Sequence, residues 1–73
     1  MNITVGWIKE IAGKWSACLE ASLGVLQGPH IFDKMEDARK AIQGAIGRPL
    51  QWTQINTRFD PECWQGWYQV PML

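Results

Sequence analysis

The segment DKMEDARKAIQGAIG, residues 33–47, carries the clearest helical pattern in the chain. Asp33 is a favourable N-cap residue, and Glu36 three residues later completes a capping box. Gly47, followed by Pro49, is typical of a helix end. The apolar residues recur at the spacing of one helix face: Met35, Ala38, Ala41, Ile42, Ala45 and Ile46. A single amphipathic helix must bury this face against another layer, so the rest of the chain has to supply a sheet.

Two runs before the helix alternate between apolar and polar residues, as strands do. The first run, residues 2–11, places these residues on one face: Ile3, Val5, Trp7 and Ile11. Ile8 and Lys9 interrupt its alternation. The second run, residues 15–24, follows the turn-forming AGK segment, so the pair predicts a β-hairpin. The second run also fits one face of a helix, but the glycines at positions 6, 13 and 24 each cost a helix about 1 kcal/mol relative to Ala and favour strands.

The remaining strands are short. A third strand is expected either at residues 25–27 or at residues 30–32, and two more at residues 50–57 and 63–70, joined by a turn centred on Asp60 and Pro61. In the last strand Trp64, Tyr68 and Val70 share one face, while the other face carries Cys63, Gln65, Trp67 and Gln69. The predicted fold class is therefore α+β: one small domain, residues 1–73, in the order β-β-β-α-β-β, with the helix on one face of a small antiparallel sheet.

The second face of such a sheet would be open. We expect Ile8, Ile55 and Trp67 on this face, with Trp67 packing across the sheet on Trp52 or Ile55. An apolar open face is a usual sign of a binding partner, and Trp is enriched at interface hot spots. The predicted partner-binding residues are Trp67, Trp52, Ile55 and Ile8. The alternative is that the Trp residues are all core, because five Trp in 73 residues supply much of the apolar area that a small core needs.

The charge balance disfavours nucleic acid as the partner. Seven basic residues match seven acidic ones, and the basic residues form no run, whereas nucleic-acid binders usually show a basic footprint. The alternative is base stacking on the sheet, for which Lys9, Lys14, Arg48 and Arg58 would have to gather beside the Trp residues. Net neutrality also does little to oppose self-association, so a homodimer or a homo-oligomeric structural subunit is a third hypothesis.

Catalytic and metal-binding patterns are not found in the sequence. Cys18, Cys63 and His30 lack the close pairing of a structural zinc site and match no nucleophile motif, so we expect no metal, no cofactor and no enzymatic activity. The N-terminal segment MNITVGWIKEIAG lacks the features of a signal peptide, and no apolar run is long enough to span a membrane. We therefore expect a cytoplasmic protein with reduced cysteines, one long-range disulfide being the alternative.

The order GKW, GPHIF and DKMEDARKAI within residues 5–46 is similar to the three-strand-plus-helix module of two DNA-binding families. These are the plant ethylene-response-factor domains and the arm-binding domains of phage integrases. The resemblance rests on these residues: Gly13, Lys14, Trp15, Phe32, Glu36, Ala38 and Ala41. It implies a topology of three strands followed by a helix. In those families Arg and Trp side chains on the exposed sheet face contact DNA, but no Arg precedes position 39 here, so the resemblance carries over the topology and not the function.

From these patterns we predict a small non-enzymatic protein that binds another protein, or itself, through an aromatic sheet face. A regulatory or accessory protein, such as an inhibitor encoded by a phage or a bacterium, has this size and composition.

Overall fold

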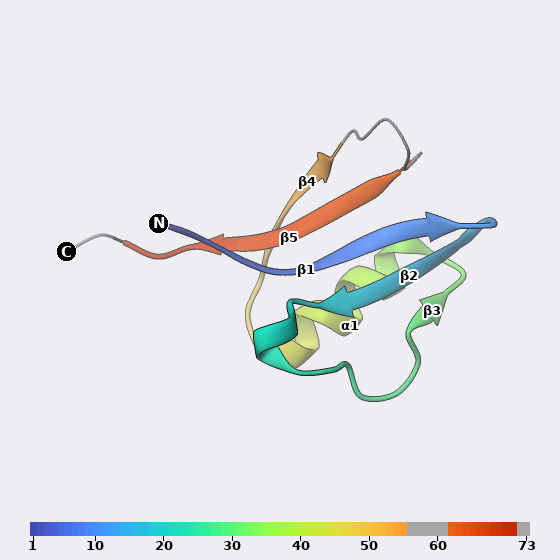
Figure 1. The fold of residues 1–73 in the computed structure, drawn as a ribbon, viewed down its shortest axis with the longest axis horizontal. Helices are drawn as coiled ribbons and strands as arrows, with labels where there is room; N and C mark the ends of the chain where they lie inside the picture. The colour runs from blue at the N-terminus through green and yellow to red at the C-terminus, as the bar shows by residue number, and fades with distance from the viewer. Residues whose placement is uncertain (56–61, 72–73) are drawn as a thin grey trace.

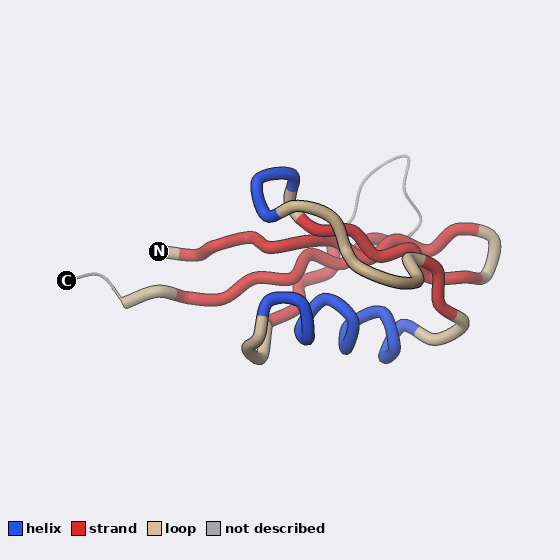
Figure 2. Tube along the Cα trace, turned by 90° about the horizontal axis from the view of Figure 1, so that it is seen from below, coloured by secondary structure: helices blue, strands red, loops and turns tan. Residues whose placement is uncertain are grey.

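The computed structural model describes residues 1–55 and 62–71 and has a five-stranded antiparallel sheet with one α-helix against one face (Figures 1 and 2). The elements are β1 (Asn2–Ile11), β2 (Lys14–Leu19), the 3-10 turn η1 (Ala21–Leu23), β3 (Ile31–Phe32), α1 (Met35–Ile46), β4 (Gln51–Ile55) and β5 (Cys63–Gln69). The strands lie in the order β3-β2-β1-β5-β4. The predicted α+β class and the order β-β-β-α-β-β are confirmed. The turn predicted at residues 60 and 61 lies outside the described residues.

The hairpin between β1 and β2 is as predicted, although β2 is shorter than expected. Ala12 and Gly13 have φ of 51° and 79° and connect the paired residues Ile11 and Lys14. Two central residues with positive φ make the tight turn that suits the twist of a hairpin. After β2 the chain leaves the sheet through η1. There Ser22 donates hydrogen bonds from its hydroxyl and its backbone N–H to the Glu20 carboxylate, and these bonds lower the pKa of that exposed group.

A β-bulge in β1 changes which side chains face the helix. The register with β5 shifts between Thr4 and Gly6, so one extra residue enters β1 at this point. As a result Val5 and Ile8 are both buried, with 1% and 0% of their surface exposed, and Trp7 turns to the opposite face of the sheet. The prediction that Ile8 lies on the open face is therefore wrong, and so is the prediction that Trp7 shares a face with Val5.

The helix begins one residue later than the capping-box prediction implies. Lys34 occupies the N-cap position and makes no side-chain cap, while the Asp33 carboxylate forms an ion pair with the Lys14 ammonium group on β2. The predicted helix end is confirmed, because Gly47 has φ of 83° and its N–H donates to the Gln43 carbonyl at 2.8 Å. Asp33 thus forms an ion pair with Lys14 in place of the capping hydrogen bond expected from the sequence.

The core lies between α1 and the adjacent face of the sheet, the side on which Figure 2 shows the helix. Its buried residues are Val5, Ile8, Ala17, Leu26, Ala38, Ile42 and Leu50, and the aromatic side chains packed around them are Trp15, Phe32, Trp52, Trp64 and Tyr68. Three of the five Trp residues therefore belong to the helix side. Within the part of the chain described, no helix has the length and apolar character needed to cross a bilayer.

Candidate functional site

The sheet face away from α1 is the candidate site, and we call it the open face. The strand register shows which residues belong to the open face, because residues directly opposite each other on paired strands point to the same side of the sheet. Trp7 lies opposite Cys18 on β2 and opposite Gln65 on β5, and Trp67 lies opposite Thr4 on β1 and Gln51 on β4. The same pairing places these residues on the open face: Asn2, Thr4, Trp7, Lys9, Ile11, Lys14, Ser16, Cys18, Gln51, Thr53, Ile55, Cys63, Gln65, Trp67 and Gln69.

Two indoles stand at the centre of the open face. Trp7 on β1 and Trp67 on β5 are diagonal neighbours, and both side chains are half-buried. Gln65 donates a hydrogen bond from its amide to the Thr4 hydroxyl between them. The indole N–H of Trp67 donates to the Thr53 hydroxyl at 2.9 Å. These bonds hold the polar groups around the two rings in place. Less side-chain conformational entropy would therefore be lost if a partner bound to this face.

A hollow of about 300 Å³ lies beside Trp7 on the open face. Its lining consists of Trp7, Lys9, Ser16, Cys18 and Cys63. Cys18 is exposed and Cys63 is buried, and they lie on the two strands that flank β1. Within residues 1–55 and 62–71 no three His, Cys, Asp or Glu side chains come together in a way that could hold a metal ion.

The predicted partner-binding residues divide between the two faces. Trp67 and Ile55 lie on the open face, as expected. Ile8 lies in the core. Trp52 lies on the helix side over Gly66, where an added Cβ would come within 2.7 Å of its ring. Trp52 and Trp67 are therefore on opposite faces and do not pack on each other across the sheet.

Sequence analysis missed Trp7 as a residue of the open face. Strict alternation placed it with Val5, and the bulge overturned that assignment. The available signal was Gly6, because a glycine inside a strand often marks a bulge or a close approach of two backbones. Here a Cβ at Gly6 would collide with the backbone carbonyl oxygen of Cys18.

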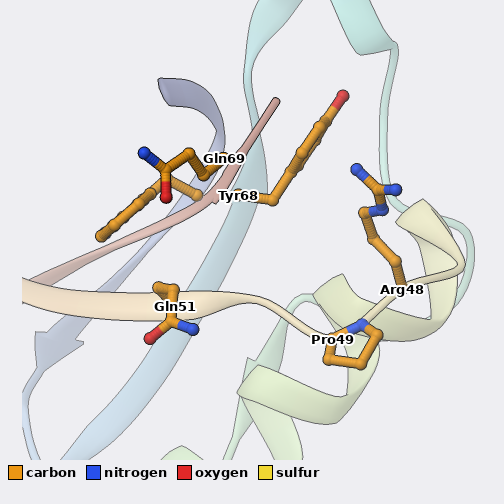
Figure 3. Close-up of a pocket in the computed structure, with 6 residues that line it drawn as sticks. Arg48, Pro49, Gln51, Tyr68 and Gln69 are labelled. Atoms are coloured by element: carbon orange, nitrogen blue, oxygen red, sulfur yellow. The ribbon is translucent and has the colours of Figure 1, made fainter. Parts of the chain in front are cut away.

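The three described cations predicted for nucleic-acid contact do not gather around the two indoles. Lys9 borders Trp7, and Lys14 lies at the hairpin end of the sheet, paired with Asp33. Arg48 lies at the other end, its guanidinium carbon 4.1 Å from the centre of the Tyr68 ring (Figure 3). That end has a hollow of about 490 Å³, which Arg48 and Trp67 help to line. Arg58 lies outside the described residues.

Arg39 covers the aromatic side chains on the helix side of the sheet. Its guanidinium carbon lies 5.6 Å from the ring centre of Trp52 and 5.1 Å from that of Trp64, which is cation–π geometry. Sequence analysis gave Arg39 no role, although it directly follows the buried Ala38 of the apolar helix stripe. The rings of Trp52 and Trp64 are thus both in contact with a cation from α1.

Comparison with known proteins gives no significant match to any family profile, any curated protein or any solved structure.

Proposed function

We propose that this protein is a small non-enzymatic binding protein, regulatory or accessory in its role, whose open face binds another protein. The observation that carries the proposal is the pair of half-buried indoles, Trp7 and Trp67, on a sheet face that no described element covers. Protein interfaces are enriched in aromatic residues and poor in charge at their centre. Uncharged polar side chains lie around Trp67 and between the two rings: Thr4, Gln51, Thr53 and Gln65. Lys9 is the charged residue beside Trp7.

The distribution of charge favours a protein over a nucleic acid as the partner. Of the basic residues assigned to nucleic-acid contact, Lys14 has its charge balanced by Asp33, and Arg48 lies against Tyr68 at the far end of the sheet. Among the described residues, Lys9 is the cation that lines the hollow beside Trp7. Phosphate backbones are normally held by several cations along one track.

The proposal assigns no catalysis to the open face. Among the described residues that line it, the hollow beside Trp7 contains a lysine and two thiols, with no carboxylate or imidazole that could act as a general base. Activation of a thiol nucleophile usually requires such a base or a strongly electropositive surrounding.

The test is affinity capture with the tagged protein from a lysate of the organism that encodes it, with and without nuclease. Trp7→Ala removes one indole from the open face, and we expect it to abolish capture of a discrete protein while near-ultraviolet circular dichroism confirms that the variant is folded. Trp7 suits this purpose better than Trp67, whose indole also bonds to Thr53.

Val25→Ala is the matched control, because Val25 is 75% exposed and lies outside the sheet. It should leave capture unchanged. A second variant, Cys18→Arg, places a long cation over the face from an exposed position and removes no core side chain. Capture that survives both Trp7→Ala and Cys18→Arg contradicts a role for the open face. If nuclease treatment abolishes capture, the open face binds nucleic acid and the proposed protein partner is wrong.

A further inference from the structure

The two edges of the sheet differ in how well they are protected from pairing with another strand. At one edge β3 is only two residues long, and Asp33 directly after it is paired with Lys14. At the other edge β4 is five residues long and pairs with β5 without interruption, from Gln51 opposite Trp67 to Ile55 opposite Cys63. Figure 1 shows β4 at the margin of the sheet with no strand beyond it.

Within the part of the chain that the structure describes, the outer side of β4 lacks the usual protective features of an edge strand. An edge strand exposes a row of unpaired N–H and C=O groups, and proteins usually protect it with charged residues, proline, bulges or a covering element. The sequence of β4, QWTQI, contains no charged residue and no proline, and its register shows no bulge. In residues 1–55 and 62–71 no strand pairs with its outer side.

We propose that the outer edge of β4 pairs antiparallel with the same edge of a second copy of this chain. A two-fold axis at Thr53 uses the whole strand: Thr53 meets Thr53, Trp52 meets Gln54, and Gln51 meets Ile55. Opposed residues then share a face, because Gln51, Thr53 and Ile55 belong to the open face while Trp52 and Gln54 point to the helix side. The two sheets become one continuous sheet with both helices on the same side.

The chemistry of β4 fits a second copy as the occupant. In a two-fold contact each edge meets itself, so any charge on it would lie near its own copy and repel it. Neither β4 nor the stretch of β5 paired with it, residues 63–67, contains a charged residue, and the whole chain has no net charge. Thr–Thr contacts across strands are favourable. Because the β3 edge is short, each copy offers one long edge and the assembly closes as a dimer.

This inference does not depend on the proposed function, because it uses the backbone edge of β4 and not the indole of Trp7. The two connect at one point: the dimer would place two open faces side by side on one surface of the continuous sheet. A partner bound through Trp7 would then meet two copies of the same face.

The test is the oligomeric state of the purified protein, measured by analytical ultracentrifugation over a wide concentration range. We expect the wild type to be a dimer of the 8.3 kDa chain at high concentration and to dissociate on dilution. Thr53→Lys and Thr53→Glu each bring like charges together at the two-fold axis, so each variant alone should be monomeric. An equimolar mixture should recover the dimer, because the two charges are then opposite. Ile31→Lys, at a 53% exposed position on β3, is the matched control and should dimerise like the wild type.

A wild type that stays monomeric at every concentration overturns the proposal, including the case in which β4 instead binds a strand of a different protein. A dimer that Thr53→Lys does not weaken overturns it as well. Because Thr53 accepts the Trp67 hydrogen bond, either variant could fail to fold. Amide hydrogen exchange of the wild type then decides: amides of residues 51–55 should exchange more slowly at high concentration than at low, and concentration-independent exchange would contradict pairing.

Discussion

Only a glycine fits at position 66 without displacing a neighbour, because the ring of Trp52 lies where a Cβ would be. The two residues are directly opposite each other on β5 and β4, and three ring atoms of Trp52 would come within 3.2 Å of an added Cβ, the nearest at 2.7 Å. Arg39 from α1 then lies over the same indole. A glycine, an aromatic ring and a guanidinium group are thus stacked from the sheet toward the helix.

Gly66→Ala should destabilise the protein by roughly 1–3 kcal/mol, the usual cost of forcing extra volume into a packed site. The added methyl group must displace the Trp52 ring, which in turn moves away from Arg39. Urea unfolding monitored by circular dichroism measures this loss of free energy, and the fluorescence of Trp52 should change in the folded variant.

Gly44→Ala is the matched control within the same protein. Gly44 lies inside α1, and an added Cβ there meets no atom within 4 Å. Replacing a glycine inside a helix by alanine should stabilise the protein by about 0.5–1 kcal/mol. Equal effects of the two substitutions would contradict the role given to the Trp52 ring.

At the scale of the element, the N-terminus of α1 lacks a side-chain cap. Lys34 at the N-cap has extended backbone angles, φ of −126° and ψ of 139°, which suit a capping residue, but its side chain accepts no hydrogen bond. Glu36 and Asp37 in the first turn suit the positive end of the helix dipole, whereas a lysine at the N-cap does not. A residue at position 34 whose side chain accepts a hydrogen bond should therefore stabilise the helix.

Lys34→Ser should stabilise the protein by about 1 kcal/mol, because the new hydroxyl can accept a hydrogen bond from a free N–H of the first turn. Thermal unfolding measures the gain. Lys34→Ala removes the same charge without supplying an acceptor, so it isolates the capping bond. A gain from Ala as large as that from Ser would assign the effect to charge alone.

The bulge in β1 shows how one residue changes an entire strand. Before it, Ile3 and Val5 point toward the helix; after it, the buried position moves to Ile8, and Trp7 joins the open face. A shift of one residue reverses the face of every later side chain, because the side-chain period of a strand is two. The three errors of the sequence prediction in β1, at Trp7, Ile8 and Ile11, have this single cause, because Ile11 also lies on the face of Trp7 and not on that of Val5.

At the scale of the whole molecule, the balance of basic and acidic residues predicts how the proposed interaction depends on salt concentration. Binding of a protein partner through the two indoles should depend only weakly on ionic strength, because among the described residues Lys9 alone places a charge beside the two rings. A nucleic-acid complex with 6–10 phosphate contacts would instead lose roughly 10³–10⁵ in affinity between 50 and 200 mM salt. Titration of the captured partner at these two salt concentrations separates the cases, and a loss of that size would contradict the proposal.

The sequence alone determined the class and order of the elements. The helix, the first hairpin and the alternation in the last strand follow from local periodicity and from turn residues, which act between near neighbours in the chain. The two faces of β5 were predicted correctly because Trp64 and Tyr68, on one side, alternate with Cys63, Gln65 and Trp67 on the other, with no bulge between them.

Only the tertiary structure decided which residues meet. Asp33 pairs with Lys14, which is distant in sequence, and does not cap the helix as expected. Trp52 lies on the helix side over Gly66. Because of the bulge, Trp7 lies on the open face. Each outcome depends on a contact between segments far apart in the chain, and periodicity carries no information about such contacts. The composition of the open face is therefore a property of the packed sheet, whereas the presence of the sheet and of its helix is a property of the sequence pattern.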